Sequence, residues 1–206
     1  GNTVVWKPAP TQQYAAHLPF LTVIHEDRSG KGLAVRTGIL AARGDYRIFC
    51  DVDFSMPVSE ISRFIPPAMP DCQIAIASRE ADGAVRYNEP SYRHFIGRVF
   101  NNLVRWTLLP GLNDTQCGFK CFSASATRDV FQYQTIPGMT FDVELIYIAR
   151  LHGFKVVEVP MTVRERLSGV SMHSGWKPFY YIAKMWLAIA MVVLREKTNI
   201  HPRKKT

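Results

Sequence analysis

Short apolar segments alternate with segments of helical length along this chain, and this alternation restricts the fold more than any other feature of the sequence. Residues 21–24 and 47–50 have the character of buried strands, and each ends at a charged stretch. Residues 31–43, between them, carry apolar side chains at partly helical spacing and are followed by Gly44, a frequent helix stop. Strand, helix and strand in this order predict a parallel α/β unit.

The same alternation continues toward the C-terminus and predicts one domain over residues 1–175. We expect further strands at 73–77, 117–122 and 155–159, and helices at 59–65, 92–108, 124–131 and 142–152. A chain of 206 residues with 47% apolar residues can bury one sizeable core. The expected fold is therefore α/β, with a mostly parallel, Rossmann-like sheet flanked by helices.

Residues 176–206 form a second region with a different pattern. Apolar residues between 176 and 195 recur at the spacing of an amphipathic helix, and the tail after it is basic. The longest run without a charge near the C-terminus, 185–194, is ten residues, whereas a helix needs about 20 to span a bilayer. The sequence leaves two roles open for this helix, packing on the core or lying on a membrane surface, where the net charge of +8 favours anionic lipids.

The composition excludes several classes of protein. Four cysteines without a Cys-x-x-Cys pair predict neither a disulfide scaffold nor structural zinc, and Cys117 and Cys121 are expected to be core thiols. A reducing, cytosolic setting follows as the default. We find no nucleic-acid-binding motif and no basic stripe with interleaved aromatic residues, so no nucleic-acid partner is expected.

Asp51 and Asp53 directly follow the expected strand 47–50. Carboxylates at the C-terminal end of such a strand face the crevice where open α/β sheets bind ligands. Oxygen ligands of this kind suit Mg²⁺ or Mn²⁺ bound together with a substrate diphosphate. An Asp-x-Asp pair alone is also common by chance, with one residue capping a helix and the other solvated.

Other segments carry groups that bind anions or accept protons. Lys31 and Gly32 open a helix, where backbone amides attract anions. Arginines able to bind a phosphate, or merely to form a solvated helix face, gather after the expected strand 73–77 at Arg79, Arg86, Arg93 and Arg98. Asp114 lies in an expected loop, where a carboxylate can act as a base. Asp142 and Glu144 begin an expected helix, where capping is the simpler interpretation.

Six segments, in a fixed order, together form a more specific pattern than any one motif. They are 30–45, 51–57, 78–79, 114–120, 141–144 and 157–160. This set resembles the family 2 glycosyltransferases of GT-A fold, and within them the polyprenyl-phosphate (dolichyl-phosphate) mannose and glucose synthases. Residues 1–20 do not match the strands and the Asp-Asp-Gly-Ser-like turn that open this family, so we expect the domain to lack its first strand unit, as a truncated chain would.

The resemblance implies a metal-dependent, inverting transfer of a hexose from a nucleotide sugar, UDP-glucose or GDP-mannose, to a polyprenyl or dolichyl phosphate. On the donor side it implies that Asp51 and Asp53 hold Mg²⁺ or Mn²⁺, with Asp51 also contacting the nucleotide. It places Lys31 and Gly32 beside the nucleotide.

On the acceptor side the resemblance implies that Arg79 and Arg93 clamp the acceptor phosphate. Arg164 is a further candidate for the diphosphate or the acceptor, and Asp114 is implied as a base or an orienting group. An enzyme of this kind is expected at the cytoplasmic face of a membrane, as a peripheral protein.

Two other functions remain open at this point. One is a family 2 transferase that acts on a saccharide hydroxyl in cell-wall or surface polysaccharide synthesis, which needs a true general base. The other is a basic membrane-binding module without catalysis, which predicts that Asp53→Ala is tolerated.

Overall fold

The computed structural model describes residues 3–5, 17–51, 56–87 and 91–164, together with seven single positions between 183 and 194. At its centre is a four-stranded sheet in the order β3–β6–β4–β7. Its strands are β3 (Tyr46–Cys50), β6 (Phe119–Ser123), β4 (Ile74–Ser78) and β7 (Val156–Pro160). All five residues of β4 are buried, which makes this strand the middle of the core.

The sheet is mixed: three of its four strands, β3, β4 and β7, run in one direction, as expected of a mostly parallel sheet, but β6 runs in the opposite direction, which was not predicted. β4 and β7 are parallel, but β6 lies between β3 and β4 and runs antiparallel to both. The cause is the connection before β6, because residues 108–118 lead the chain to the edge where β3 and β4 end. β6 must therefore start at that edge and run back.

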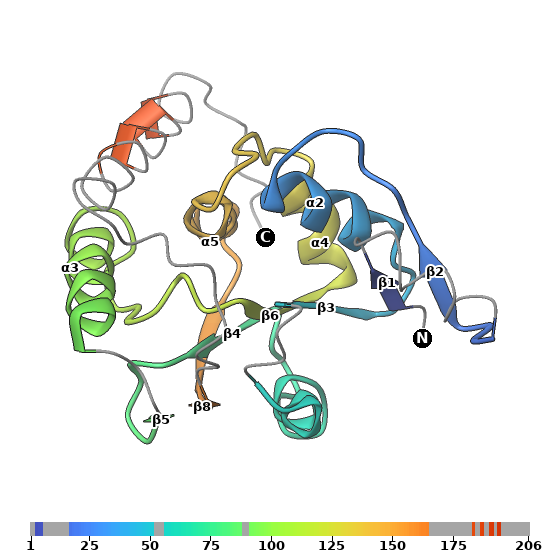
Figure 1. Ribbon diagram of the computed structural model, residues 1–206, viewed down its shortest axis with the longest axis horizontal. Helices are drawn as coiled ribbons and strands as arrows, with labels where there is room; N and C mark the ends of the chain where they lie inside the picture. The colour runs from blue at the N-terminus through green and yellow to red at the C-terminus, as the bar shows by residue number, and fades with distance from the viewer. Residues whose placement is uncertain are drawn as a thin grey trace.

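Helices cover one face of the sheet and a 3-10 helix covers the other (Figure 1). The first face carries α2 (Lys31–Ala41), α4 (Ala124–Phe131) and α5 (Phe141–Leu151), and the second carries η1 (Val58–Phe64). Side chains alternate between the faces, as in any strand. Ile74 and Ile76 join the cluster under the helices, whereas Ala75 and Ala77 join the one under η1.

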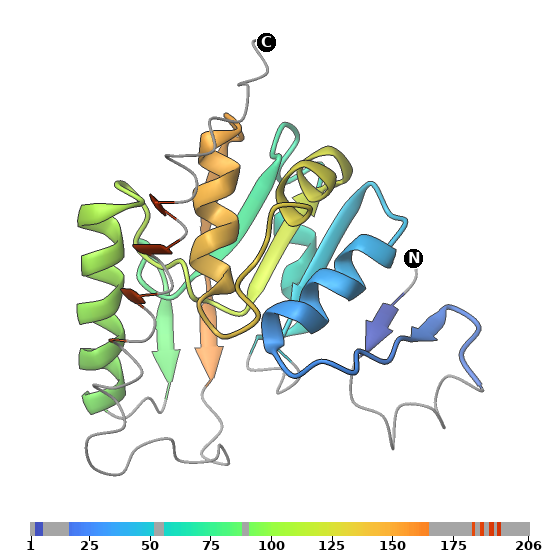
Figure 2. The same ribbon diagram turned by 90° about the horizontal axis from the view of Figure 1, so that it is seen from above.

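The longest of the helices that the structure describes, α3 (Ser91–Thr107), lies beside α5 at the margin of the sheet (Figures 1 and 2). Its existence and length agree with the helix expected at 92–108. Most of the expected helix 176–195 and the basic tail lie outside the described residues. Within the described part of the chain, no helix is long and apolar enough to cross a bilayer.

Two small parallel sheets were not predicted. β1 (Thr3–Val5) pairs with β2 (Leu21–Val23), and β5 (Val85–Tyr87) pairs with β8 (Thr162–Arg164). β2 corresponds to the strand expected at 21–24, but β1, β5 and β8 are three residues long, which is too short to show a period in the sequence. β1 lies within residues 1–20, so this region contributes a strand next to β2 that sequence analysis did not expect.

The start of α2 packs tightly against the connection between α4 and α5. The Gly32 N–H donates to the Pro137 carbonyl at 2.8 Å, and the Gly32 carbonyl accepts from Gln134 Nε2 at 2.8 Å. A Cβ added at Gly32 would lie 2.5 Å from the Ile136 carbonyl oxygen and 2.8 Å from Phe141 Cβ. Only glycine fits there without moving backbone.

We expect Gly32→Ala to lower the free energy of unfolding by about 1–3 kcal/mol, because the added methyl overpacks this contact. Urea unfolding measures the change. Gly97→Ala in α3 is the matched control, since a Cβ at Gly97 has nothing within 4 Å and alanine favours a helix by up to about 1 kcal/mol. A Gly32→Ala chain as stable as the Gly97→Ala chain would contradict this account of the packing.

Candidate active site

One edge of the central sheet brings together three of the residues predicted from the sequence. Asp51 follows the end of β3, Arg79 follows the end of β4, and Asp114 lies in the loop that leads into β6. Cys50 of β3 is paired with Phe119 of β6, so the end of one strand meets the start of the other. The antiparallel direction of β6 therefore carries the Asp114 loop to the edge that holds Asp51 and Arg79.

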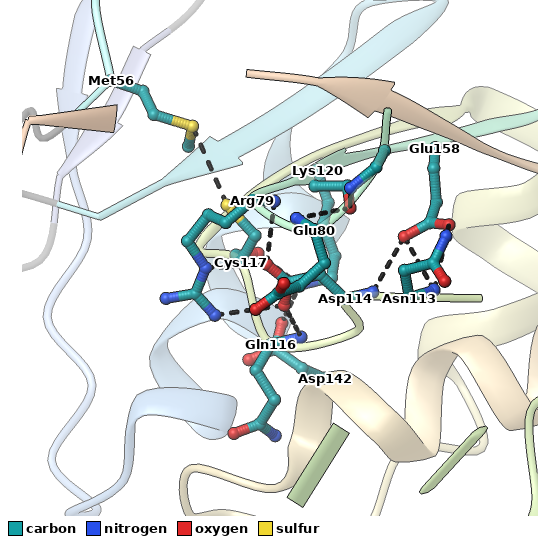
Figure 3. A network of polar contacts seen from close by, with 12 residues as sticks. Met56, Arg79, Glu80, Asn113, Asp114, Gln116, Cys117, Lys120, Asp142 and Glu158 are labelled. Atoms are coloured by element: carbon teal, nitrogen blue, oxygen red, sulfur yellow. Dashed lines mark hydrogen bonds and ion pairs between the residues drawn. The ribbon is translucent and has the colours of Figure 1, made fainter. Parts of the chain in front are cut away.

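Arg79 and Asp114 bind each other (Figure 3). Oδ2 of Asp114 accepts from Arg79 Nε at 2.7 Å and from the Arg79 N–H at 3.0 Å. Oδ1 accepts from Arg79 Nη2 at 3.1 Å and from the Gln116 N–H at 3.1 Å. The Asp114 side chain is fully buried, while 28% of the Arg79 side chain is exposed. This bidentate ion pair fixes the guanidinium of Arg79 at the rim of the site.

Asp114 is poorly suited to accept a proton. Burial alone would raise its pKa, but the charge and hydrogen bonds of Arg79, with a smaller effect of Lys120, hold the pKa below the ordinary value. Its two oxygens already accept four N–H groups. Of the two roles expected for Asp114, base or orienting group, the geometry fits the orienting one.

Glu158 of β7 holds the loop that carries Asp114 (Figure 3). Its carboxylate accepts from the Asp114 N–H at 2.8 Å, from the Asn113 N–H at 3.0 Å and from Asn113 Nδ2 at 3.0 Å. Arg105 of α3 donates to Asn113 Oδ1 at 3.1 Å. No role for Glu158 was predicted from the sequence, where a charge between two valines of an expected strand fits the ordinary alternation of strand faces.

Asp51 and Lys31 form the other part of the site. Lys31 Nζ lies 2.6 Å from Asp51 Oδ1, and the Asp51 N–H donates to the Gly118 carbonyl at 3.0 Å. The carboxylate lies directly against the Cα of Gly118, where any Cβ would collide with it. The side chain of Asp51 is 39% exposed and that of Lys31 is 27% exposed, so a phosphate can reach both from solvent.

Asp51 fits the oxygen chemistry of a Mg²⁺ or Mn²⁺ ligand, and such ions are often held by one or two carboxylates plus substrate phosphates. Asp53, the second predicted ligand, lies outside the described residues. Among the residues that the structure does describe, no group of three or more His, Cys, Asp or Glu could hold a metal.

The remaining predicted residues have less defined positions. Gly32 is buried against the α4–α5 connection. This packing alone explains why the residue is a glycine, and no contact with a nucleotide is needed to explain it. The backbones of Arg93 and Arg164 lie in α3 and at the end of β8, but their side chains lie outside what the structure describes.

The capping interpretation of Asp142 and Glu144 was wrong. Both lie in the first turn of α5, but this helix has no side-chain cap. Glu144 instead accepts from the Thr135 N–H and hydroxyl, at 2.9 and 2.7 Å, and from the Ile136 N–H at 2.7 Å. Asp142 pairs with Lys120, which sequence analysis gave no role. A lysine inside the apolar segment 119–122 was the available signal.

Cys117 and Cys121 are core thiols, as expected. None of the four cysteines forms a disulfide, and Cys72 is buried as well. Burial raises the pKa of Cys117 and of Cys121 to about 12. Cys50 is exposed and directly precedes Asp51.

Comparison with known proteins agrees with this arrangement. The profile named Glycosyl transferase family 2 matches residues 8–132, more than half of the chain. The chain belongs to glycosyl transferase family 2. The match begins well before residue 21, so it includes part of the region in which sequence analysis found no likeness.

Curated relatives in this family share about a third of the aligned residues. A dolichyl-phosphate beta-glucosyltransferase of Trichomonas vaginalis is 31% identical over 159 residues, which cover 74% of this chain and 47% of that protein. The dolichyl-phosphate beta-glucosyltransferase of Mus musculus is 30% identical over 184 residues, which cover 86% of this chain and 55% of that protein. The chain spans about half the length of the curated relatives it matches.

The fold is similar to that of glucosyl-3-phosphoglycerate synthase from Mycobacterium tuberculosis. The complex with phosphoglyceric acid has a TM-score of 0.64 at 17% identity and covers 90% of this chain and 67% of that one. The complex with Mn²⁺, UDP-glucose and phosphoglyceric acid has a TM-score of 0.61 at 16% identity and covers 89% and 67%. The likeness shows a shared α/β fold of GT-A type.

We expect Cys50 to be the thiol that reacts first in the folded family 2 chain. Iodoacetamide at about pH 8 should modify Cys50 rapidly and leave Cys117 and Cys121 unmodified, because thiolates react and burial keeps these two thiols protonated. Peptide mass spectrometry identifies the modified residue, and Cys50→Ser should remove the fast reaction. Equal labelling of Cys117 and Cys50 would contradict the burial.

Asp114 should stabilise the fold in a pH-dependent way. Because its folded pKa lies below the ordinary value, its carboxylate contributes fully above about pH 4, and the contribution is lost as the pH falls through the folded pKa. The difference in unfolding free energy between wild type and Asp114→Asn should therefore shrink below about pH 4. Urea unfolding across that range measures it.

The control for this experiment is Asp71→Asn, which changes an exposed carboxyl group just before β4, away from the site. If the difference in unfolding free energy between wild type and Asp114→Asn stays constant down to about pH 2, Asp114 is not held as a buried carboxylate.

Proposed function

We propose that this chain carries the catalytic site of a hexosyltransferase that moves glucose from UDP-glucose to a polyprenyl or dolichyl phosphate, with inversion at the anomeric carbon. The observation that carries the proposal is the state of Asp114. Its carboxylate is buried, bound by Arg79 and held at a low pKa. A saccharide hydroxyl needs a base to remove its proton, whereas an acceptor phosphate is already an anionic nucleophile near neutral pH.

In this proposal the acceptor end of the site works by position and charge. Asp114 fixes the Arg79 guanidinium, which binds the acceptor phosphate together with the predicted Arg93. A phosphate oxygen forms the new bond to the anomeric carbon as the bond to the nucleoside diphosphate breaks, and no covalent enzyme intermediate is needed. Holding the two reactants in line supplies the rate enhancement.

The donor end consists of Lys31, Asp51 and the predicted Asp53, with Arg164 as a further predicted contact. The Lys31 ammonium binds the diphosphate, and Asp51 and Asp53 would hold Mg²⁺ or Mn²⁺. When bound, such an ion neutralises charge on the leaving diphosphate. Support for UDP-glucose comes from the relatives, which are named glucosyltransferases, and from a fold neighbour whose complex contains Mn²⁺ and UDP-glucose.

We further place this activity at the cytoplasmic face of a membrane, as a peripheral protein. The proposed acceptor is a membrane lipid, and the chain has a net charge of +8, which favours anionic leaflets. Leu187, Met191 and Leu194 expose apolar side chains at helical spacing, as a helix on a lipid surface requires. None of the four cysteines forms a disulfide, which fits a reducing compartment.

The test is transfer of labelled glucose from UDP-glucose, with Mn²⁺, to a polyprenyl phosphate in detergent. We expect Asp53→Ala to abolish product, and Asp114→Asn to lower kcat/KM by about 10-fold while leaving measurable turnover, because a lost orienting contact costs less than a lost base, which is worth about 10²–10⁴-fold. Asp71→Asn serves as the control.

Each alternative function has its own outcome in this assay. Transfer to a saccharide but not to the lipid phosphate, abolished by Asp114→Asn, would indicate a hydroxyl acceptor. Lipid binding without product, unchanged by Asp53→Ala, would indicate a binding module. Product from GDP-mannose alone would keep the acceptor and change the donor.

A further inference from the structure

A buried ion pair lies between the two ends of the site. Lys120 Nζ of β6 lies 2.5 Å from Asp142 Oδ1 of α5, donates to the Cys117 carbonyl at 2.6 Å and stands 5.5 Å from the centre of the Phe49 ring. The two side chains are 0% and 2% exposed. A buried pair of this kind is often no more stabilising than two apolar side chains of similar size. Stability alone therefore does not explain it.

Charges of alternating sign run through this pair from one end of the site to the other. The charge of Lys120 acts on both Asp114 and Asp142: it helps to hold the pKa of Asp114 below its ordinary value, and it limits the rise that burial causes in the pKa of Asp142. Burial raises the pKa of Asp142, and Lys31, from the donor end, opposes that rise. The row consists of three ion pairs, Asp51–Lys31, Asp142–Lys120 and Asp114–Arg79, and the electrostatic effects of Lys31 and Lys120 connect one pair to the next.

Hydrogen bonds and a packing contact also connect Lys120 to the site. Lys120 donates to the carbonyl of Cys117, the residue before Gly118, and Gly118 in turn accepts the Asp51 N–H and lies against the Asp51 carboxylate. Residues 114–118 thus connect Asp114 to Gly118, which contacts Asp51, and the buried ammonium of Lys120 donates to the Cys117 carbonyl within this segment.

From this arrangement we infer that Lys120 and Asp142 are a positioning pair. The pair keeps the two ends of the site at a fixed position relative to each other: the donor end, which is Lys31 and Asp51, and the acceptor end, which is Arg79 and Asp114. Neither side chain reaches solvent, so neither touches a substrate. The inference rests on the proposed function for the assignment of the two ends. The competing explanation is that the pair only fastens α5 to the sheet.

The two explanations differ for a variant that removes both charges. Lys120→Met/Asp142→Val replaces the pair with apolar side chains, and we expect its melting temperature to stay within about 3 °C of wild type. We expect kcat/KM for glucosyl transfer to fall at least about 10-fold, with a higher KM for UDP-glucose and for the polyprenyl phosphate. A mere loss of folded protein would lower kcat and leave both KM values unchanged.

Ile148→Val is the matched control. It removes one methyl group from a second fully buried side chain of α5, which lies toward the C-terminal end of the helix and is not part of the row. We expect this variant to lower the melting temperature and to leave both KM values unchanged. UDP binding by calorimetry, measured separately for every variant, reports the donor end without catalysis.

A folded double variant with kcat and both KM values within about twofold of wild type would overturn the inference. If the double variant does not fold, the nearly isosteric Asp142→Asn decides in its place. Asp142→Asn should raise both KM values, and unchanged values would overturn the inference. Wild type that binds UDP but gives no product would overturn the proposed lipid acceptor, whereas failure to bind UDP at all would overturn the donor assignment and this inference with it.

Discussion

The antiparallel insertion of β6 between β3 and β4 is the constraint on which the rest of the site depends. In a purely parallel sheet, the loop before a strand lies at the edge opposite to the ends of its neighbours. Because β6 runs the other way, the loop before it lies next to Asp51 and Arg79. The loop brings Asp114 to Arg79 and Gly118 to Asp51, and the strand brings Lys120 under both.

The individual elements were largely predictable from the sequence, because their apolar periodicity is strong. The helix expected at 124–131 has those bounds in the structure, and the strand expected at 73–77 is shifted by one residue. The direction of β6 was not predictable, because this strand is buried on both faces and therefore lacks the alternation that usually marks an antiparallel strand. The three-residue strands β1, β5 and β8 are defined by their partners and not by local pattern.

The candidate site was predictable as a set of residues and not as a set of contacts. Asp51, Lys31, Arg79 and Asp114 were selected from the sequence, and the structure places them at one edge of the sheet. That Arg79 and Asp114 bind each other could not be read from positions 35 residues apart. Glu158, Lys120 and Asp142 act from beneath the site, and only Lys120 and Asp142 were marked in the sequence, by a charge inside an apolar segment.

The tight contact between the start of α2 and the α4–α5 connection has a consequence for how this domain can vary in length. Gly30 and Gly32 both lie directly against residues 136 and 137, and Lys31 stands between them. An inserted residue near 136 would have no space and would displace Lys31 from Asp51. Insertions and deletions that leave the site intact should therefore collect elsewhere, such as in the exposed turn at residues 81–84, where Gly83 has open space around it.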